Sequence, residues 1–137
     1  MIKVLFICHG NICRSPMAEF VMKDLVKKAG LADQFEIASA ATSREEIGNP
    51  VHRGTRNKLK QYGISVDGKY AVQMTSADYR YYDYIIAMER YNLRNMERFV
   101  HGDPDHKYIF YWILQIARVI LQIRGIQEIL MKHMMMF

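Results

Sequence analysis

Two cysteines and an arginine lie together in one short segment near the start of the chain, VLFICHGNICRSP, at residues 4–16. Cys8 and Arg14 are six positions apart, and Ser15 follows the arginine directly. A thiolate is a strong nucleophile, and a guanidinium group can hold two phosphate oxygens through parallel hydrogen bonds. A cysteine and an arginine at this spacing therefore indicate attack on phosphorus, with a phosphocysteine intermediate.

The residues around this pair are suited to binding an anion through the backbone. Gly10 and Asn11 tolerate left-handed backbone angles, so successive N–H groups can turn inward around a phosphate. Ser15 and Pro16 are typical of the N-cap and first position of a helix, whose N-terminus favours anions. We expect the same donors to stabilise a Cys8 thiolate, with the Ser15 hydroxyl as a further donor to sulfur.

The elements around the loop alternate between strand and helix. Apolar runs rich in β-branched residues predict strands at residues 2–8, 35–41 and 83–88. Helical patterns predict helices at residues 16–29, 51–63, 75–82 and 89–99. This order predicts an α/β fold, a small three-layer sandwich with a central parallel sheet. The phosphate-binding loop joins the first strand to the first helix, at the edge of the sheet where ligands bind in such folds.

Composition narrows the class of protein. The chain has 137 residues, of which 50% are apolar and 24% charged, as expected for one globular domain. The apolar runs are too short for a membrane span, and the start lacks a signal-peptide pattern, so we expect no membrane partner. Two neighbouring cysteines do not make a disulfide framework, which favours the cytoplasm. The net charge of +5 allows a phosphate-bearing substrate. The basic residues are scattered, so we expect no nucleic-acid partner.

The segment VLFICHGNICRSPMAE resembles the signature of the low-molecular-weight protein-tyrosine phosphatases. The resemblance continues through SAATSREEIGNPVHRGTRNKL, YGI and DYIIAMERYNLRNM, and covers roughly residues 2 to 107. It implies a four-stranded parallel sheet, with Cys8 as nucleophile, Arg14 binding the phosphoryl oxygens and Ser15 tuning the thiolate. It also implies that the substrate is a phosphotyrosine-containing protein or a small phosphomonoester, and that neither a metal nor another cofactor takes part.

The resemblance also assigns the rest of the loop. The residues implied to bind substrate are His9, Gly10, Asn11, Ile12, Cys13 and Ser15. Asn11 and Ser39 match positions that hold the loop's shape by hydrogen bonds. Ile12 matches the tyrosine phosphatases, whereas related arginine phosphatases carry threonine there. Cys13 is either a packing residue or the partner of Cys8 in a reversible disulfide. Arsenate reductases that share the loop need further cysteines, which this chain lacks.

Three positions depart from the family pattern. His9 stands where leucine or another uncharged residue is usual, and Glu45 stands where many relatives place an aromatic side chain beside the substrate ring. Lys69 lies near a usual histidine. We expect these departures to change substrate preference rather than the chemistry, and we expect His9 to be a solvated imidazole.

The largest departure begins after residue 107. The family carries a late Asp-Pro pair, whose Asp protonates the leaving group, and no such pair follows residue 107 here. Asp103-Pro104 lies earlier and is better explained by turn chemistry. One choice of synonymous codons for residues 120–137 encodes a different peptide when translation starts at the third base. That peptide, IADPWYTGNFDETYDDV, contains the Asp-Pro pair of the family pattern, followed by aromatic residues. We therefore hypothesise that a one-base deletion near Lys107 shifted the reading frame.

The predicted organisation is a single phosphatase domain over residues 1–137, with residues 1–107 family-like and residues 108–137 aberrant. Residues 108–114 are apolar enough to form the fourth strand, and no family-like helix or acid loop is expected beyond Arg118. The predicted function is hydrolysis of phosphotyrosine, impaired by the missing acid. The alternatives are a phosphate- or phosphotyrosine-binding module without significant turnover, and a protein-arginine phosphatase.

Overall fold

A computed structural model describes residues 1–88, 90–104 and 108–109 of the chain. The strands are β1 (Ile2–Cys8), β2 (Phe35–Ala41), β3 (Tyr84–Ala87) and β4 (Tyr108–Ile109). The helices are α1 (Arg14–Lys28), α2 (Arg53–Lys60), α3 (Ser76–Tyr81) and α4 (Arg90–Val100), with a short 3₁₀ turn, η1 (Ala32–Gln34). All strand pairs are parallel, in the order β2-β1-β3-β4. The predicted α/β fold with a central parallel sheet is confirmed.

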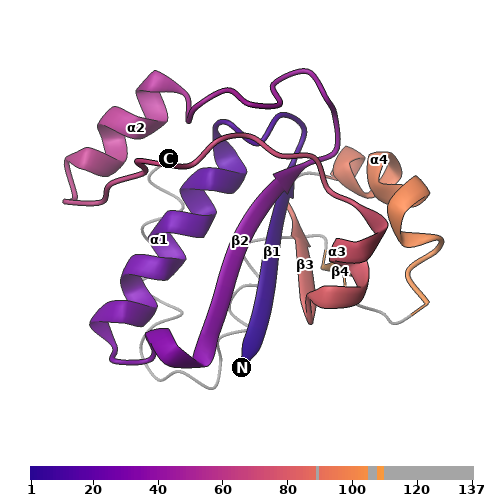
Figure 1. Cartoon of the computed structure of the whole chain (residues 1–137), viewed down its shortest axis with the longest axis horizontal. Coiled ribbons are helices and arrows are strands. Elements are labelled where there is room, and N and C mark those ends of the chain that lie inside the picture. The colour runs from indigo at the N-terminus through magenta and orange to yellow at the C-terminus, as the bar shows by residue number, and fades with distance from the viewer. Residues whose placement is uncertain (89, 105–107, 110–137) are drawn as a thin grey trace.

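Strand β1 is the centre of the molecule, and its side chains alternate between two hydrophobic clusters. Val4 and Phe6 pack on one face with residues of α1 and α2. Leu5 and Ile7 pack on the other face with residues of α3 and α4. The sheet is therefore covered by helices on both faces, which produces the three layers visible in Figure 1. Burial of both faces explains why β1 reads as a continuous apolar run.

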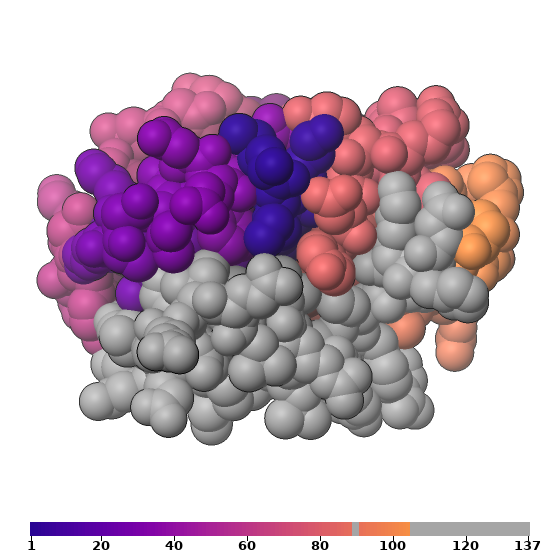
Figure 2. Space-filling view, turned by 90° about the horizontal axis from the view of Figure 1, so that it is seen from below, coloured from indigo at the N-terminus to yellow at the C-terminus, as the bar shows by residue number. Residues whose placement is uncertain are grey.

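The strand order positions the loop that follows β1. The chain leaves β1 for β2 on one side and later returns to β3 on the other, so the order reverses at β1. Ligands of such sheets bind outside the carboxyl end of the strand at this reversal. The loop lies at the upper end of the sheet in Figure 1. Figure 2 shows the opposite end, where the start of the chain (indigo) reaches the surface between purple and salmon segments.

Two helices begin at positions that the sequence did not predict. The N-cap of α1 is Cys13 and not Ser15, and it makes no side-chain cap. Ser15 is the second residue of the helix, because its hydroxyl contacts Cys8 instead of the helix backbone. Helix α2 begins at Arg53, where the His52 ring accepts a hydrogen bond from the backbone of Gly54. The cap predicted for the short third helix is confirmed, with a capping box at its start.

The chain beyond α4 is described only in part. Asp103 has a φ of +55°, donates its backbone N–H to Val100 and accepts a hydrogen bond from the Tyr79 hydroxyl at 2.6 Å, which fits the turn interpretation. Strand β4 pairs with β3, so the predicted fourth strand is present at its first two residues. Residues 110–114 and the expectations beyond Arg118 lie outside the described residues. Among the described helices, none is long and apolar enough to cross a bilayer.

Candidate active site

The predicted nucleophile, Cys8, ends strand β1 and is buried at the start of the loop. Its Sγ accepts a hydrogen bond from the backbone N–H of Asn11 at 3.2 Å and lies 2.9 Å from the hydroxyl oxygen of Ser15. Both groups can donate to sulfur, so the loop is arranged to stabilise negative charge on this atom. The Ser15–Cys8 contact that the sequence predicts is therefore present.

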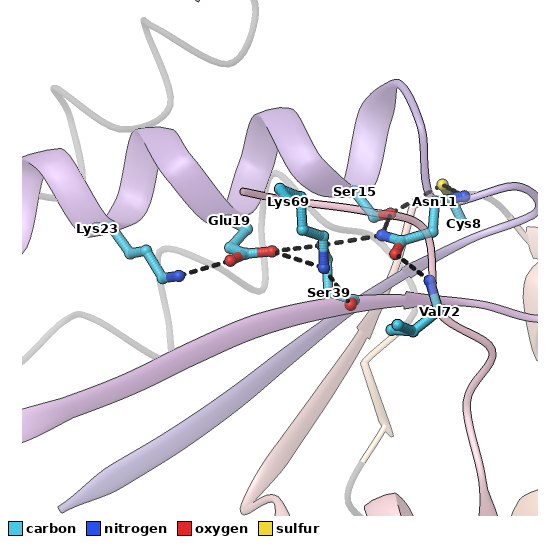
Figure 3. Close-up of polar contacts among 8 residues, drawn as sticks. All are labelled: Cys8, Asn11, Ser15, Glu19, Lys23, Ser39, Lys69 and Val72. Carbon is cyan, nitrogen blue, oxygen red and sulfur yellow. Dashed lines mark hydrogen bonds and ion pairs between the residues drawn. The ribbon is translucent and has the colours of Figure 1, made fainter. Parts of the chain in front are cut away.

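Asn11 determines the shape of the loop. It is buried with a φ of +59°, in the left-handed region that asparagine tolerates. Its Nδ2 donates to the hydroxyls of Ser15 and Ser39, each at 2.9 Å. Its Oδ1 accepts a hydrogen bond from the backbone N–H of Val72 at 3.1 Å (Figure 3). One side chain thus ties the loop to α1, to β2 and to the segment before α3.

A buried carboxylate, Glu19 on α1, extends this network along the helix. It accepts hydrogen bonds from the Ser39 hydroxyl at 2.5 Å and from Lys23 Nζ at 2.6 Å. Lys69 Nζ lies 3.3 Å from the same carboxylate and donates to the Ser39 carbonyl oxygen at 2.9 Å (Figure 3). A buried carboxylate is tolerated only when it is paired and hydrogen-bonded, and these groups meet that need. The network holds Ser39, and through it Asn11, in place.

A cavity of about 290 Å³ lies at the loop. Six of its lining residues are predicted site residues: Cys8, His9, Gly10, Ile12, Cys13 and Arg14. Arg14 is the first residue of α1, so an arginine and the positive end of the helix lie at the same cavity. The other predicted residues, Asn11, Ser15 and Ser39, are buried outside this lining and contact one another.

The arrangement has a counterpart among known proteins. The sequence profile described as low molecular weight phosphotyrosine protein phosphatase matches residues 3–113, a span that includes the cavity and the network. The chain belongs to this family. The low-molecular-weight phosphatase family was also the one that the sequence resembled.

Individual relatives agree with this assignment. The low molecular weight protein-tyrosine-phosphatase YfkJ of Bacillus subtilis is 49% identical over 96 residues, which make up 70% of this chain and 62% of YfkJ. The crystal structure of YfkJ is similar with a TM-score of 0.81 at 32% identity, covering 98% of this chain and 90% of that structure. The sequence match therefore spans less than two thirds of the length of YfkJ.

Two further crystal structures are similar over nearly the whole chain. The low molecular weight protein tyrosine phosphatase SP-PTP of Streptococcus pyogenes has a TM-score of 0.76 at 38% identity, covering 98% of this chain and 89% of that structure. Drosophila arginine phosphatase has a TM-score of 0.74 at 27% identity, covering 97% of this chain and 90% of that structure.

Sequence reasoning missed part of the candidate site. Tyr91 and Asn92 complete the lining of the cavity at the start of α4, and they follow the carboxyl end of β3. Because the carboxyl ends of parallel strands meet at one edge of the sheet, their place after β3 was a usable signal. Glu19 also had a signal, since it lies four residues after Ser15 and so shares its face of α1.

His9 lies at the edge of this cavity, where its Nε2 is 2.9 Å from a carboxylate oxygen of Glu45. Both side chains are largely exposed to solvent, at 43% and 71%. An exposed pair of this kind contributes little to stability. The two positions that depart from the family pattern therefore contact each other at the mouth of the site. The His9 imidazole is solvated, as the sequence predicts, and also has a carboxylate partner.

Helix α2 contacts the loop from the other side. The backbone N–H of His52 donates to the Ile12 carbonyl oxygen at 2.7 Å, and Cys13 Sγ lies 3.2 Å from the Thr55 hydroxyl oxygen. Both Cys8 and Cys13 are free thiols here. Within the described residues, no group of three or more His, Cys, Asp or Glu side chains could hold a metal ion.

Proposed function

We propose that this chain is a protein-tyrosine phosphatase that hydrolyses phosphotyrosine through a phosphocysteine intermediate. The observation that carries the proposal is the position of Cys8 Sγ. It lies within reach of the Asn11 N–H and the Ser15 hydroxyl, in a cavity whose lining also includes Arg14. A nucleophile surrounded by donors for anions is suited to attack on a phosphate ester. A reactive free thiol also favours a reducing compartment, and we place the protein in the cytoplasm.

The proposed reaction has two steps. In the first, the Cys8 thiolate attacks phosphorus, a sulfur–phosphorus bond forms, and the bond from phosphorus to the tyrosine oxygen breaks. The phenolate leaves with the bonding electron pair and takes up a proton. In the second step, water attacks phosphorus and loses a proton to solvent, an oxygen–phosphorus bond forms, and the sulfur–phosphorus bond breaks. The electron pair of that bond returns to sulfur, which regenerates the thiolate and releases inorganic phosphate. Arg14 and the loop N–H groups bind the phosphoryl oxygens in both steps.

Protonation of the leaving group is the step for which this site offers the least support. Among the described residues that line the cavity, none is an aspartate or a glutamate. General acid catalysis typically contributes about 10²–10⁴ in rate, and the contribution is largest when the leaving group is a strong base. We therefore propose that turnover of phosphotyrosine is impaired in this chain, in line with a shifted frame after Lys107.

Two other functions remain open to test. Similarity to Drosophila arginine phosphatase supports activity on phosphoarginine, whereas Ile12 favours phosphotyrosine. The lack of an acid among the described lining residues supports a module that binds phosphotyrosine without significant turnover.

The test compares three substrates on two proteins. The substrates are p-nitrophenyl phosphate, a phosphotyrosine peptide and a phosphoarginine peptide. The proteins are this chain and a version with one base added near Lys107, each with a Cys8→Ser blank. We expect this chain to retain activity on p-nitrophenyl phosphate, whose leaving group needs no proton, and to lose far more on the phosphotyrosine peptide. The loss should be smaller in the second protein.

Each other outcome has a distinct meaning. Faster turnover of phosphoarginine than of phosphotyrosine by both proteins would assign the chain to the arginine phosphatases. Tight binding of the phosphotyrosine peptide with no turnover of any substrate would make it a binding module. An equal ratio of rates in both proteins would reject the missing acid as the cause of impairment.

A further inference from the structure

A second and larger cavity lies away from Cys8, between α2 and the segment at residues 63–67. Its volume is about 750 Å³, compared with about 290 Å³ for the cavity at the phosphate loop. Sites for small molecules typically have volumes of roughly 300–1,000 Å³. The larger cavity contains no cysteine, so the chemistry of the nucleophile does not account for it. We call it the α2 cavity. Helix α2 is the magenta helix beside α1 in Figure 1.

One wall of the α2 cavity is strongly basic. Arg53, Arg56 and Lys60 line it, and their spacing of three and four residues places them on one face of the helix. Among the residues that the structure describes, none forms an ion pair or a side-chain hydrogen bond with these three side chains. Within the described part of the chain, no carboxylate is therefore paired with the positive charge on this wall.

This placement of charge works against the helix itself. Arg53 lies in the first turn, where the helix dipole disfavours cations and where α2 has no acidic residue. Arg56 and Lys60 are like charges four residues apart, a spacing that destabilises an isolated helix. Lys60 lies in the last turn, where the dipole favours a cation, so helix formation leaves only Arg53 and the Arg56–Lys60 repulsion unexplained. A ligand that supplies negative charge would stabilise all three cations.

A second, partly apolar wall of the cavity is firmly held. Ile64 and Val66 line the cavity and are only 9% and 5% exposed. The turn that carries them is fixed to the end of α2, since Gly63 has a φ of +74° and the Ile64 N–H donates to the Leu59 carbonyl oxygen at 3.0 Å. Asp67 is the one acidic residue among the described lining residues, and its carboxylate can accept a hydrogen bond from a hydroxyl or amino group.

We propose that the α2 cavity is a binding site for a small phosphorylated molecule. Such a ligand carries at least two negative charges, which pair with Arg53, Arg56 and Lys60. It also has an apolar or aromatic part that packs on Ile64 and Val66. The site is separate from the phosphate loop and does not depend on the phosphatase function proposed above.

The probes for this site are ATP and inorganic tripolyphosphate, both without added metal, and the full chain is used throughout. Backbone NMR reports where each probe binds, and isothermal titration calorimetry reports its affinity. We expect both probes to shift the amide signals of residues 53–67, and not only those of the phosphate loop. Because ATP also covers the apolar wall, it should bind more tightly than tripolyphosphate at this site.

Charge reversal on α2 provides a matched pair of variants. Arg56→Glu places an acid in the cavity wall, whereas Lys58→Glu makes the same charge change on the same helix outside the lining. Loss of one hydrogen-bonded charge pair costs about tenfold in affinity or more. We therefore expect Arg56→Glu to weaken ATP binding at residues 53–67 at least about tenfold, and Lys58→Glu by less than about threefold. Thermal melts check that both variants remain folded.

Three results would overturn the proposal. The first is that both probes shift only residues 10–15, which means that the phosphate loop is the sole anion site. The second is that Lys58→Glu weakens binding as much as Arg56→Glu, which indicates attraction to net charge without a site. The third is tighter binding of tripolyphosphate than of ATP, which rejects the apolar wall. If phosphatase activity proves absent while residues 53–67 bind ATP, the proposal stands and only the proposed function fails.

Discussion

The phosphate loop and the α2 cavity both favour anions, but they are built in opposite ways. In the loop, one arginine joins backbone N–H groups and a buried side chain, Asn11, that uses both its amide nitrogen and its amide oxygen. In the α2 cavity, three cations lie on a helix surface without ion-pair partners among the described residues. The loop has fixed geometry with little charge, and the cavity has charge with little fixed geometry.

The difference shows which structural property a reaction at phosphorus needs and which property the binding of a charged molecule needs. A reaction at phosphorus requires donors placed to within a fraction of an ångström of the developing charge, and buried hydrogen bonds provide that precision. Binding of a charged molecule tolerates mobile side chains, because attraction between charges depends weakly on orientation. Variants that change geometry should therefore affect the loop most, and variants that change charge should affect the cavity most.

The largest expected effect is that of Arg14→Lys. The change keeps the positive charge but removes the planar fork that holds two phosphoryl oxygens. We expect turnover of p-nitrophenyl phosphate to fall by roughly two orders of magnitude or more. The matched change in the α2 cavity is Arg56→Lys. We expect it to leave turnover unaltered and to change the affinity for ATP by less than about threefold. Steady-state kinetics and calorimetry on both variants test the pair, and equal effects on the two anion sites would remove the distinction between them.

The second effect concerns Asn11→Ala. The change leaves the Val72 N–H and the Ser39 hydroxyl without their Asn11 partners, and it keeps a residue with a side chain at positive φ. We expect a loss of about 2 kcal/mol in the free energy of unfolding, and a fall in turnover of at least about tenfold. Urea denaturation and kinetics measure both. Asn57→Ala in the wall of the α2 cavity is the control, with an expected change within about 0.5 kcal/mol.

The third effect concerns the carboxylate below the loop. Glu19→Gln removes the charge that pairs with Lys69 and Lys23, and the largely buried Lys69 side chain then lacks its carboxylate. We expect the free energy of unfolding to fall by about 1–3 kcal/mol. The control, Asp24→Asn, breaks an exposed pair with Lys28 on the same helix and should cost less than about 0.5 kcal/mol.

A double variant shows whether the cost of Glu19→Gln comes from the unpaired Lys69 charge or from the changed side chain. If the buried pair matters, Glu19→Gln combined with Lys69→Met should recover part of the lost stability, because no uncompensated ammonium remains. Equal costs for Glu19→Gln and Asp24→Asn in thermal melts would mean that the network below the loop is no stronger than a surface pair.

The smallest effect concerns the contact between the two regions. Thr55→Val keeps the shape of the side chain and removes the hydroxyl that lies 3.2 Å from Cys13 Sγ. We expect the free energy of unfolding to change by less than about 1 kcal/mol, and turnover to stay within about twofold. The informative measurement is the rate of alkylation of Cys13: a fall indicates that the Thr55 hydroxyl donates to the sulfur and stabilises its thiolate, and a rise indicates that the hydroxyl accepts from the thiol. A loss of turnover as large as that of Arg14→Lys would show that α2 is part of the catalytic machinery.

The sequence predicted the parts of the molecule that depend on local pattern. β1, β2 and the Cys8–Arg14 loop follow from apolar runs and from residue chemistry at short range, and the structure contains them where predicted. The N-cap of α1 was wrongly predicted because local preference for serine at a cap competes with the sulfur of Cys8, and the sulfur contact is present instead.

The parts that were not predicted depend on distant segments. Glu19 looks like a surface acid on a helix until β2 supplies the Ser39 hydroxyl and the segment after α2 supplies Lys69. Likewise the α2 cavity needs the turn at residues 63–67 to fold against the helix before its basic face becomes a wall. The position of Glu19 on the same face of α1 as Ser15 marks the residue, but a pattern within one element cannot reveal the partners of Glu19 or the walls of the cavity.

The bonds of Asn11 also bear on the order in which the protein folds. They join residues 28 and 61 positions apart, so they can form only after β2 and the segment around Val72 have docked on β1. Contacts over such separations are entropically costly and form late. The loop therefore cannot bind phosphate in a partly folded chain, and added phosphate should slow unfolding while leaving the rate of refolding nearly unchanged.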